Sequence, residues 1–349
     1  MKSGSSKIII SENFSFPFDE GSKKILLYLY DVLGSHMDWQ FITELDNDTK
    51  NFDIKKISLG KFFLSTELRR VIKDYSPDFI VYLPEASYTF NSFLRAKIFK
   101  LLNKKSKVIV IGNQKRRFNK VFSYCLKFLK PDLLFIFDEN AKDFFSRKNF
   151  NVKIIPPVVD LEKFIPAKND LKRLLRQKYG FKNESKIVLH VGHLKGTRNV
   201  ERLIDIQKMD GFQAILVGST STQQDYNLKE RLRKKGLVIM DSYIENIEEV
   251  YQLSDIYYFP VEKDNAAVDM PLSILEAMAC NLPVVTTTFG ALNNYFDEDK
   301  YFRYYDTLRL DIDLIKNIPL NNVNNREKVK CFSRSNLANT IIKGCNNLL

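Results

Sequence analysis

The chain has 349 residues, of which 44% are hydrophobic and 28% are charged, and this composition excludes a disordered or collagen-like protein. At the usual size of folded domains, the length corresponds to about two domains. The formal net charge of +12 predicts an anionic partner such as a nucleic acid, a phosphorylated substrate or an anionic lipid.

The sequence shows neither a membrane span nor an export signal. No stretch approaches the roughly 18 uninterrupted apolar residues of a spanning helix. The apolar run Ile8–Ile10 is too short for the core of a signal peptide. The four cysteines are scattered without a C-x-x-C pair, which is typical of reduced thiols, so we expect a cytoplasmic protein.

Short apolar runs alternate with helical patterns along the chain. The runs predict strands at 7–11, 79–83, 107–112, 133–137, 152–156, 187–192, 213–218, 237–240, 256–260 and 283–287. The helical patterns lie at 23–33, 119–129, 169–178, 198–207, 247–253 and 272–280. Strands rich in Ile, Val and Leu that alternate with helices predict parallel sheets covered on both faces. Two such series predict an α/β protein of two doubly wound, Rossmann-like domains.

The domain junction is predicted at Pro156 and Pro157, which end the last strand of the first series. We therefore expect one domain over 1–157, a second over 158–325, and a helical tail over 326–349 whose packing against the first domain is left open. Ligands of open α/β sheets bind beyond the carboxyl ends of the strands, and the natural site is the cleft between the two domains.

The loop after the strand at 187–192 carries the strongest phosphate-binding pattern. Gly192 allows a phosphate group to approach the backbone closely, and Arg198 can bind two phosphate oxygens at once. The start of a helix adds partial positive charge. His193 lies between them; a diphosphate site and a solvated basic loop are the two interpretations. Gly21 opens the first helix after a strand, but without a G-x-G-x-x-G pattern it is by itself better explained as a turn.

Two further loops follow strands. In the first, Asp269 is expected to cap a helix that continues to Glu276, a carboxylate among apolar neighbours. Because burying an unpaired carboxylate is costly, we favour contact with a ligand hydroxyl over a buried network. In the second, Gln114 and Arg116 favour phosphate or acceptor contact and an exposed basic turn about equally.

Four segments together resemble the GT-B glycosyltransferases of family 4, the large retaining group. The segments are IPPVVDLEKF at 155–164, LHVGHLKGTR at 189–198, IEEVYQLSDIYYFP at 247–260 and PLSILEAMACNLPVVTTTFGA at 271–291. They are similar to the family's domain-linking motif, its V-G-R-L-x-x-x-K-G loop, its Y-x-x-A-D-V strand motif and its L-E-A-M-A-x-G-x-P-V-V motif. The resemblance implies two domains facing across a cleft, the first on the acceptor side and the second binding the donor.

The resemblance also assigns roles to single residues. The family's diphosphate-binding arginine and lysine fall on His193 and Arg198, so one of the two cations is replaced by an imidazole. The second glutamate of the family's E-x7-E falls on Glu276, which would hold the donor ribose, whereas the first falls on Val268, one residue before Asp269. The implied catalytic residues are Arg198, Glu276 and Asp269, the implied donor contacts also include Gly21, Gly192, His193, Met270, Pro271 and Leu272, and the acceptor side holds Gln114 and Arg116.

The implied reaction is the retaining transfer of a sugar from a nucleotide-sugar to an acceptor hydroxyl, a glycosyltransferase or hexosyltransferase activity. The pathway would be cell-surface polysaccharide, lipid-linked oligosaccharide or glycoprotein biosynthesis. We expect no cofactor and no metal, and the D-x-D strings at 46–48 and 311–313 are attributed to chance. A sugar-nucleotide epimerase of the same fold and a catalytically degraded nucleotide-sugar-binding protein stay open, whereas nucleic acid is not an expected partner.

The segment from Phe93 to Lys130 contains twelve Lys and Arg and no Asp or Glu. Within it, one apolar helical stripe is predicted from five side chains: Phe118, Val121, Phe122, Cys125 and Leu129. A core-facing helix with a solvated basic face is the slightly favoured interpretation. The other is an anionic membrane surface that would hold the protein peripherally at the inner face of the membrane.

Overall fold

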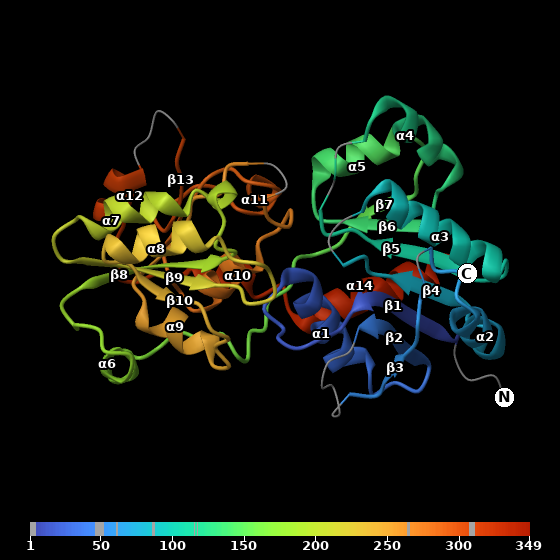
Figure 1. Cartoon of the computed structure of the whole chain (residues 1–349), viewed down its shortest axis with the longest axis horizontal. Coiled ribbons are helices and arrows are strands. Elements are labelled where there is room, and N and C mark those ends of the chain that lie inside the picture. Colours follow the sequence, from blue (N-terminus) through green and yellow to red (C-terminus); the bar gives the residue numbers. More distant parts are fainter. Residues whose placement is uncertain are drawn as a thin grey trace. The chain divides into compact units, whose positions relative to one another are not determined.

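The computed structural model describes residues 5–45, 52–60, 62–85, 88–114, 116, 118–263, 266–306 and 311–349. The chain forms two compact units, which are shown in Figure 1. Unit 1 holds Met1–Pro157, Val268–Met270 and Arg334–Leu349, and unit 2 holds Val158–Ala267 and Pro271–Ser333. Among the described residues, no helix is both long and apolar enough to cross a membrane.

Unit 1 is built on a parallel sheet of seven strands in the order β3-β2-β1-β4-β5-β6-β7. Its strands are β1 (Lys7–Asn13), β2 (Trp39–Leu45), β3 (Ile54–Lys56), β4 (Phe79–Tyr82), β5 (Lys107–Ile111), β6 (Leu133–Ile136) and β7 (Val152–Ile154). Every residue of β4 and β6 is buried, because helices cover both faces of a parallel sheet.

The helices of unit 1 are α1 (Gly21–Leu33), α2 (Thr66–Tyr75), α3 (Phe90–Leu102), α4 (Lys120–Cys125), α5 (Glu139–Ser146) and α14 (Arg334–Asn346). The apolar sides of α2, α3 and α5 share one core with alternate residues of the strands, among them Leu134 and Ile136. Helix α14 packs against α1. It approaches β6 so closely that a Cβ on Gly344 would lie 2.6 Å from the Phe135 ring. Since Phe135 points away from Leu134 and Ile136, the C-terminal helix covers the opposite face of the sheet.

Unit 2 repeats the plan with six parallel strands in the order β10-β9-β8-β11-β12-β13. Its strands are β8 (Lys186–Gly192), β9 (Phe212–Gly218), β10 (Val238–Met240), β11 (Ile256–Phe259), β12 (Val284–Thr286) and β13 (Phe302–Tyr304). Its helices are α6 (Asn169–Lys178), α7 (Leu203–Gln207), α8 (Tyr226–Lys234), α9 (Ile247–Leu253), α10 (Leu272–Ala279), α11 (Leu292–Tyr295), α12 (Asp311–Asn317) and α13 (Asn325–Val329). The predicted pair of doubly wound, Rossmann-like domains is thereby confirmed.

Three strands were not predicted from the sequence: β2, β3 and β13. Strand β2 mixes polar residues into its run, and β3 is a three-residue strand at the edge of its sheet with a largely exposed pattern. Strand β13 is the edge strand of the other sheet. Edge strands are held by backbone pairing on one side only, so their sequences need no continuous apolar run.

Unit 2 extends to Ser333, beyond the boundary predicted at residue 325, because α13 is anchored to it. The Arg326 guanidinium donates to the carbonyl oxygens of Phe164, Ala279 and Leu161 at 2.5, 2.6 and 2.7 Å. The side-chain amide of Asn325 donates to the carbonyls of Leu282 and Tyr301. The tail that belongs to unit 1 therefore begins only at Arg334.

Replacing Arg326 tests this anchor. Arg326→Ala leaves three backbone carbonyls without their charged donor, so we expect the free energy of unfolding to fall by about 3 kcal/mol. The measurement is urea unfolding followed by far-UV circular dichroism. Arg231→Ala is the control, because the pair of Arg231 with Glu201 is exposed and should contribute less than about 1 kcal/mol. Equal losses in the two variants would show that α13 is not anchored in this way.

Candidate functional site

The order of strands in unit 2 reverses between β8 and β11. From β8 the chain continues to β9 on one side of the sheet, whereas β11 lies on its other side. The loops that leave the carboxyl ends of β8 and β11 therefore run in opposite directions, which opens a crevice where ligands of this class of fold bind. Gly192 ends β8, and the loop after β11 leads to α10.

Arg198 lies in the loop after β8 and is almost completely buried, with 7% of its surface exposed. It ends a 3₁₀ turn, Gly196–Arg198, rather than opening the predicted helix, and α7 begins only at Leu203. Within the described part of the chain, no hydrogen bond or ion pair holds its guanidinium, and its Nε is buried without a partner. Burial lowers the pKa of Arg198 to about 10, so it still carries its charge at neutral pH.

Gly192 brings the backbone close to two side chains. A Cβ at this position would lie 3.1 Å from Nε2 of His190 and 3.2 Å from Nη1 of Arg198. His190 is fully buried in the middle of β8, and its Nδ1 lies 2.9 Å from the carbonyl oxygen of Tyr258. A carbonyl can only accept, so Nδ1 carries the proton and Nε2 presents a lone pair, for which no described residue is a donor.

His190 is a site residue that the sequence analysis missed. Burial, with a smaller contribution from the charge of Arg198, lowers the pKa of His190 to about 4. The imidazole is therefore neutral at pH 7 and adds no second positive charge beside Arg198. The sequence does hold a sign of this role, because His190 is a polar ring inside an otherwise apolar strand. Side chains alternate along a strand, so His190 lies on the same face as the core residue Val188.

Glu276 lies on α10 and is 1% exposed. Its carboxylate accepts a hydrogen bond of 2.8 Å from the hydroxyl of Tyr251, and burial together with this negative charge raises the pKa of Tyr251 well above its usual value. Burial is the main cause of the raised pKa of Tyr257, while the charge of Glu276 raises this pKa further and the charge of Arg198 lowers it. The Tyr257 hydroxyl donates to the carbonyl of Val191 at 3.3 Å. Glu276 is thus part of a buried network, the alternative the sequence analysis favoured less, and Tyr257 lies within electrostatic range of both charged groups.

The other predicted donor contacts are spread over the two units. His193 in unit 2 has its Nδ1 2.6 Å from the Thr222 hydroxyl. Pro271, not Asp269, is the N-cap of α10, so the predicted cap is wrong. Leu272 is the first residue of that helix, and Met270 is buried in unit 1.

Asp269 belongs to unit 1, where it lies beside the loop after β5. Its backbone N–H donates to the carbonyl of Asn113 at 2.9 Å, and its carboxylate accepts from the Tyr88 hydroxyl at 3.4 Å. Asn113 is completely buried, and neither atom of its side-chain amide has a partner among the described residues. Two unpaired buried polar atoms are costly, so Asn113 is a candidate for ligand contact that the sequence analysis passed over in favour of Gln114.

The remaining candidates of unit 1 lie near these residues in the sequence or the fold. Gln114 is buried with 4% exposure and its carbonyl accepts from the N–H of Tyr88, whereas Arg116 is half-buried. Neither of these two residues is freely exposed, although one of the interpretations expected an exposed turn. Gly21 is the first residue of α1, and a Cβ there would touch the side chain of Val268 at 3.4 Å.

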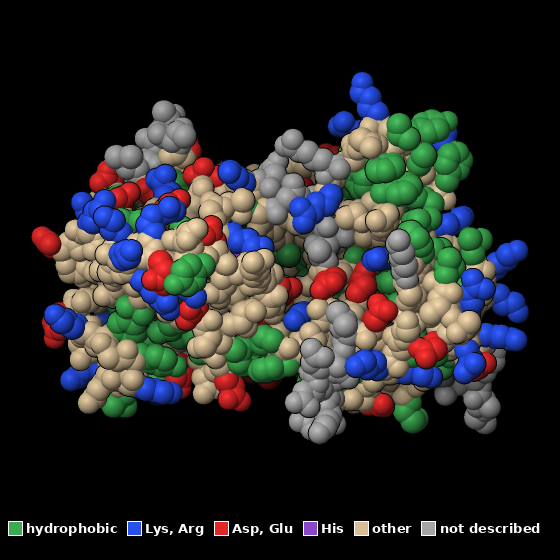
Figure 2. Space-filling model, in the orientation of Figure 1, with side chains coloured by type: hydrophobic (Ala, Val, Ile, Leu, Met, Phe, Trp, Pro, Cys, Tyr) green, Lys and Arg blue, Asp and Glu red, His purple; other side chains and the backbone are tan. Residues whose placement is uncertain are grey.

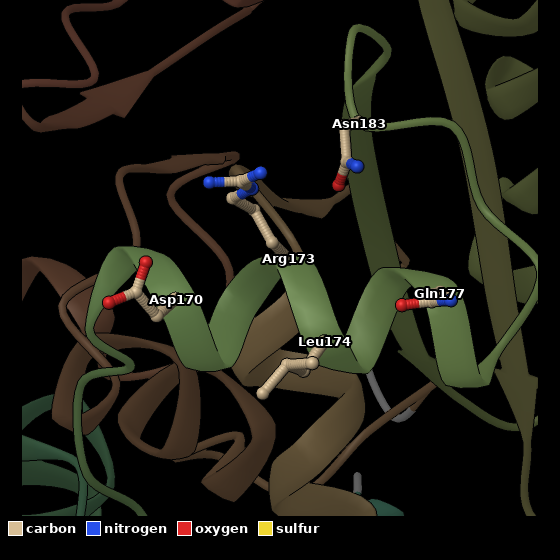
Figure 3. Close-up of a pocket in the computed structure, with 5 residues that line it drawn as sticks. All are labelled: Asp170, Arg173, Leu174, Gln177 and Asn183. Carbon is tan, nitrogen blue, oxygen red and sulfur yellow. The ribbon is translucent and has the colours of Figure 1, made fainter.

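Two hollows in the described surface of unit 2 lie elsewhere. One pocket has a volume of about 260 Å³ and lies beside α6. Figure 3 shows the residues that line it: Asp170, Arg173, Leu174, Gln177 and Asn183. A larger hollow of about 770 Å³ adjoins it and includes Asp255 and Pro283. Asn183, Asp255 and Pro283 precede β8, β11 and β12, so both hollows lie at the amino ends of the strands, opposite to Arg198. They are not the expected ligand site of a parallel sheet.

Of the two D-x-D strings, the first, at 46–48, lies outside the described residues. In the second, the carboxylate of Asp311 is held by the guanidinium of Arg202 at 2.7 and 2.8 Å and also accepts from the Tyr258 hydroxyl. This carboxylate is therefore occupied by the packing of α12 onto the sheet. The prediction that the protein needs no metal stays a prediction.

Comparison with known proteins found one matching family model and several relatives, each over part of the chain. The family described as glycosyl transferases group 1 matches residues 172–304, most of unit 2. A mannosylfructose-phosphate synthase of Agrobacterium fabrum is 26% identical over 169 residues, which cover 42% of this chain and 35% of that protein. An Escherichia coli UDP-Gal:α-D-GlcNAc-diphosphoundecaprenol α-1,3-galactosyltransferase is 27% identical over 206 residues, covering 56% of this chain and 50% of that protein. The matched region thus spans at most about half the length of these relatives.

Solved structures with this fold cover nearly the whole chain. HepE of Anabaena, in complex with UDP-glucose, has a TM-score of 0.75 at 16% identity and covers 98% of this chain and 99% of its own. A sucrose-phosphate synthase of Thermosynechococcus elongatus has a TM-score of 0.74 at 14% identity, with 98% and 99% coverage. The chain therefore has the two-domain GT-B fold.

The buried neutral imidazole predicts a pH dependence of stability. An unfolded histidine binds a proton near pH 6.5, whereas folded His190 does so only near pH 4, so the unfolded state binds more protons between these values and stability falls as the pH falls. Between pH 7 and pH 5, wild type should lose about 2 kcal/mol more than His190→Asn in the free energy of unfolding.

Urea unfolding at the two pH values measures this difference. His36→Asn is the control, because His36 is exposed and its replacement should leave the pH dependence of the wild type unchanged. A His190 imidazole that titrates near pH 6.5 in an NMR titration would contradict the burial argument.

Proposed function

We propose that the protein is a retaining glycosyltransferase that moves a sugar from a nucleotide-sugar donor to an acceptor hydroxyl. The observation that carries the proposal is the buried guanidinium of Arg198, which has no counter-charge among the described residues and follows the carboxyl end of β8. Burying an uncompensated charge costs several kcal/mol, and a bound anion offsets that cost. A donor diphosphate is such an anion, and a guanidinium matches its oxygens.

The reaction breaks the bond between the anomeric carbon and a diphosphate oxygen and forms a bond to the acceptor oxygen on the same face. Negative charge grows on the leaving diphosphate, whose oxygen takes up the proton that the acceptor hydroxyl loses. We assign Arg198 to stabilise this growing charge in a site where water screens it little. Gly192 supports the assignment, because its missing side chain leaves room beside Nη1 of Arg198.

Glu276 is assigned to hold a hydroxyl of the donor ribose. The Tyr251 hydroxyl donates to Oε2 of the Glu276 carboxylate, which fixes the orientation of the group. A buried carboxylate of fixed orientation discriminates strongly for a ligand that presents a hydroxyl donor.

The acceptor is assigned to unit 1, at the carboxyl ends of its strands. Gln114 and Arg116 were the predicted contacts there, and the structure adds Asn113, whose amide has unsatisfied donors and acceptors suited to a sugar hydroxyl. Asp269 lies against the backbone of this residue. We give Asp269 a role in positioning the substrate beside Asn113.

The proposed substrates are a sugar nucleotide and a saccharide or lipid-linked acceptor in the synthesis of a surface polysaccharide, a lipid-linked oligosaccharide or a glycoprotein glycan. Support comes from the similar Escherichia coli protein, whose name describes transfer to a diphosphoundecaprenol-linked sugar. All four cysteines are free, and a cytoplasmic location stays a prediction. No observation on the structure favours the epimerase or the degraded binding protein.

Calorimetric titration with UDP, GDP and ADP tests the role of Arg198. We expect one of these diphosphates to bind wild type and to bind Arg198→Ala about 10- to 100-fold more weakly, because a charge-assisted contact in a buried site is lost. Lys195→Ala is the matched control, since it removes the same charge from an exposed position of the same loop and should change affinity less than about threefold. Equal binding by wild type and Arg198→Ala would remove Arg198 from the site.

The reaction itself is tested by donor turnover with a membrane lipid extract as the source of acceptor. Release of nucleoside diphosphate that depends on the extract indicates transfer. An epimerase would instead convert the donor sugar without net release of nucleoside diphosphate. The anomeric configuration of the product, read by NMR, tests retention.

Asn113→Ala is expected to separate function from stability. Removing an amide that has no protein partner should not lower the free energy of unfolding, whereas loss of its contact with substrate should slow extract-dependent release of diphosphate at least about tenfold. Asn151→Ala is the control, because this exposed amide of the same unit donates to the carbonyl of Asp132. A stability loss of several kcal/mol with unchanged activity would make Asn113 a structural residue.

A further inference from the structure

The segment formed by α4 and the 3₁₀ turn that follows it is apolar on both of its sides. Inward, Leu126 is buried in the core of unit 1, and Phe118 and Leu129 pack against that core. Outward, Val121, Tyr124 and Phe128 are 67%, 63% and 61% exposed. The core-facing part of the favoured interpretation is confirmed. The predicted single apolar stripe is not, because Val121 and Phe122 face solvent and the outer side carries large apolar groups as well as lysines.

These outward groups form one surface. Val121, Tyr124 and Phe128 are spaced by three and four residues, so they lie on one side of a helical turn, and Phe122, 43% exposed, lies next to them. We call these four residues the aromatic surface. Figure 2 shows hydrophobic side chains gathered over the part of unit 1 where Figure 1 draws α4. No residue of α4 itself is buried.

Two exposed lysines flank the aromatic surface. Lys120 and Lys127 are exposed beside it, and Nζ of Lys127 lies 3.7 Å from the centre of the Tyr124 ring and 4.8 Å from that of Phe128. The sequence from Phe93 to Lys130 contains no Asp or Glu, so no carboxylate of this segment neutralises these lysines.

We propose that the aromatic surface docks on an anionic lipid bilayer. Aromatic rings flanked by lysines suit the headgroup region, where the rings enter the edge of the acyl layer and the ammonium groups meet lipid phosphates. Each lysine near such a surface attracts anionic lipid, and several act together. The centre of a protein interface is instead depleted of lysine, which makes a protein partner the less fitting occupant. The proposal concerns where the protein acts and does not depend on the reaction proposed for it.

Vesicle sedimentation of the full chain tests the docking. The two lipid compositions are phosphatidylcholine alone and phosphatidylcholine mixed with phosphatidylglycerol, each at about 0.05 M and about 0.5 M salt. We expect binding to the anionic vesicles at low salt, much weaker binding to the neutral vesicles, and a clear loss at high salt. No sedimentation with anionic vesicles at low salt would overturn the proposal.

Two double variants separate the contribution of the aromatic rings to vesicle binding from that of the lysine charges. Tyr124→Ser with Phe128→Ser removes rings, and Lys120→Gln with Lys127→Gln removes charges; each should weaken binding to anionic vesicles at least about tenfold. Phe122 is left unchanged because its ring stacks on Phe90 with centroids 4.5 Å apart. Since the replaced side chains are exposed, thermal unfolding should match wild type, and the lysine variant alone would still decide if the ring variant proved unstable.

Unit 2 offers a matched control. Tyr226 is 68% exposed, and Nζ of Lys229, three residues later, lies 5.8 Å from its ring centre, so this pair repeats the chemistry of Tyr124 and Lys127 outside the aromatic surface. Tyr226→Ser should bind vesicles as wild type does. Loss of binding in this control equal to that in the ring variant would overturn the assignment. So would a dimer in sedimentation velocity that only the ring variant dissociates.

Discussion

A positive charge that is buried without a partner governs the candidate site. Arg198 is held out of water by the loop after β8, yet no described carboxylate neutralises it. Folding alone gains nothing from such an arrangement, because the desolvation of the guanidinium is not repaid within the protein. The fold tolerates it at the carboxyl end of its first strand in unit 2, where the order of strands reverses and an anionic ligand can supply the missing charge.

The surroundings of Arg198 keep that charge single and accessible. His190 lies close by but is held neutral by burial, with its proton fixed on Nδ1 by the carbonyl of Tyr258. Gly192 leaves room for both groups, because a side chain at this position would crowd the imidazole and the guanidinium. Tyr257 lies within electrostatic range of both Arg198 and Glu276, and the Tyr251 hydroxyl fixes the orientation of the Glu276 carboxylate. Neighbouring buried side chains thus set the protonation and orientation of the groups that would bind a donor.

Apolar segments are fully buried in α10 of unit 2 but only partly buried around α4 of unit 1. In unit 2 the apolar residues around Glu276 are buried with it, as the sequence suggests. In unit 1 the segment around α4 has more apolar side chains than one side of a helix can bury, and the surplus faces solvent among lysines. This short helix and the 3₁₀ turn after it meet the core on one side only, through Leu126 and its neighbours, so the excess marks a surface available to a partner.

The sequence by itself determined the two doubly wound domains and the loops that end at their carboxyl edges. Continuous apolar strands such as β4, β6 and β11 leave no other way to bury their side chains. It also singled out Arg198 and Glu276 by residue type and position. Only the tertiary structure decided what these residues meet: the neutral state of His190, the bond from Tyr251 to Glu276, the unpartnered amide of Asn113, and the outward turn of Tyr124 and Phe128. Each depends on contacts between residues far apart in the chain or on which side of a helix meets the core, and local spacing does not fix either.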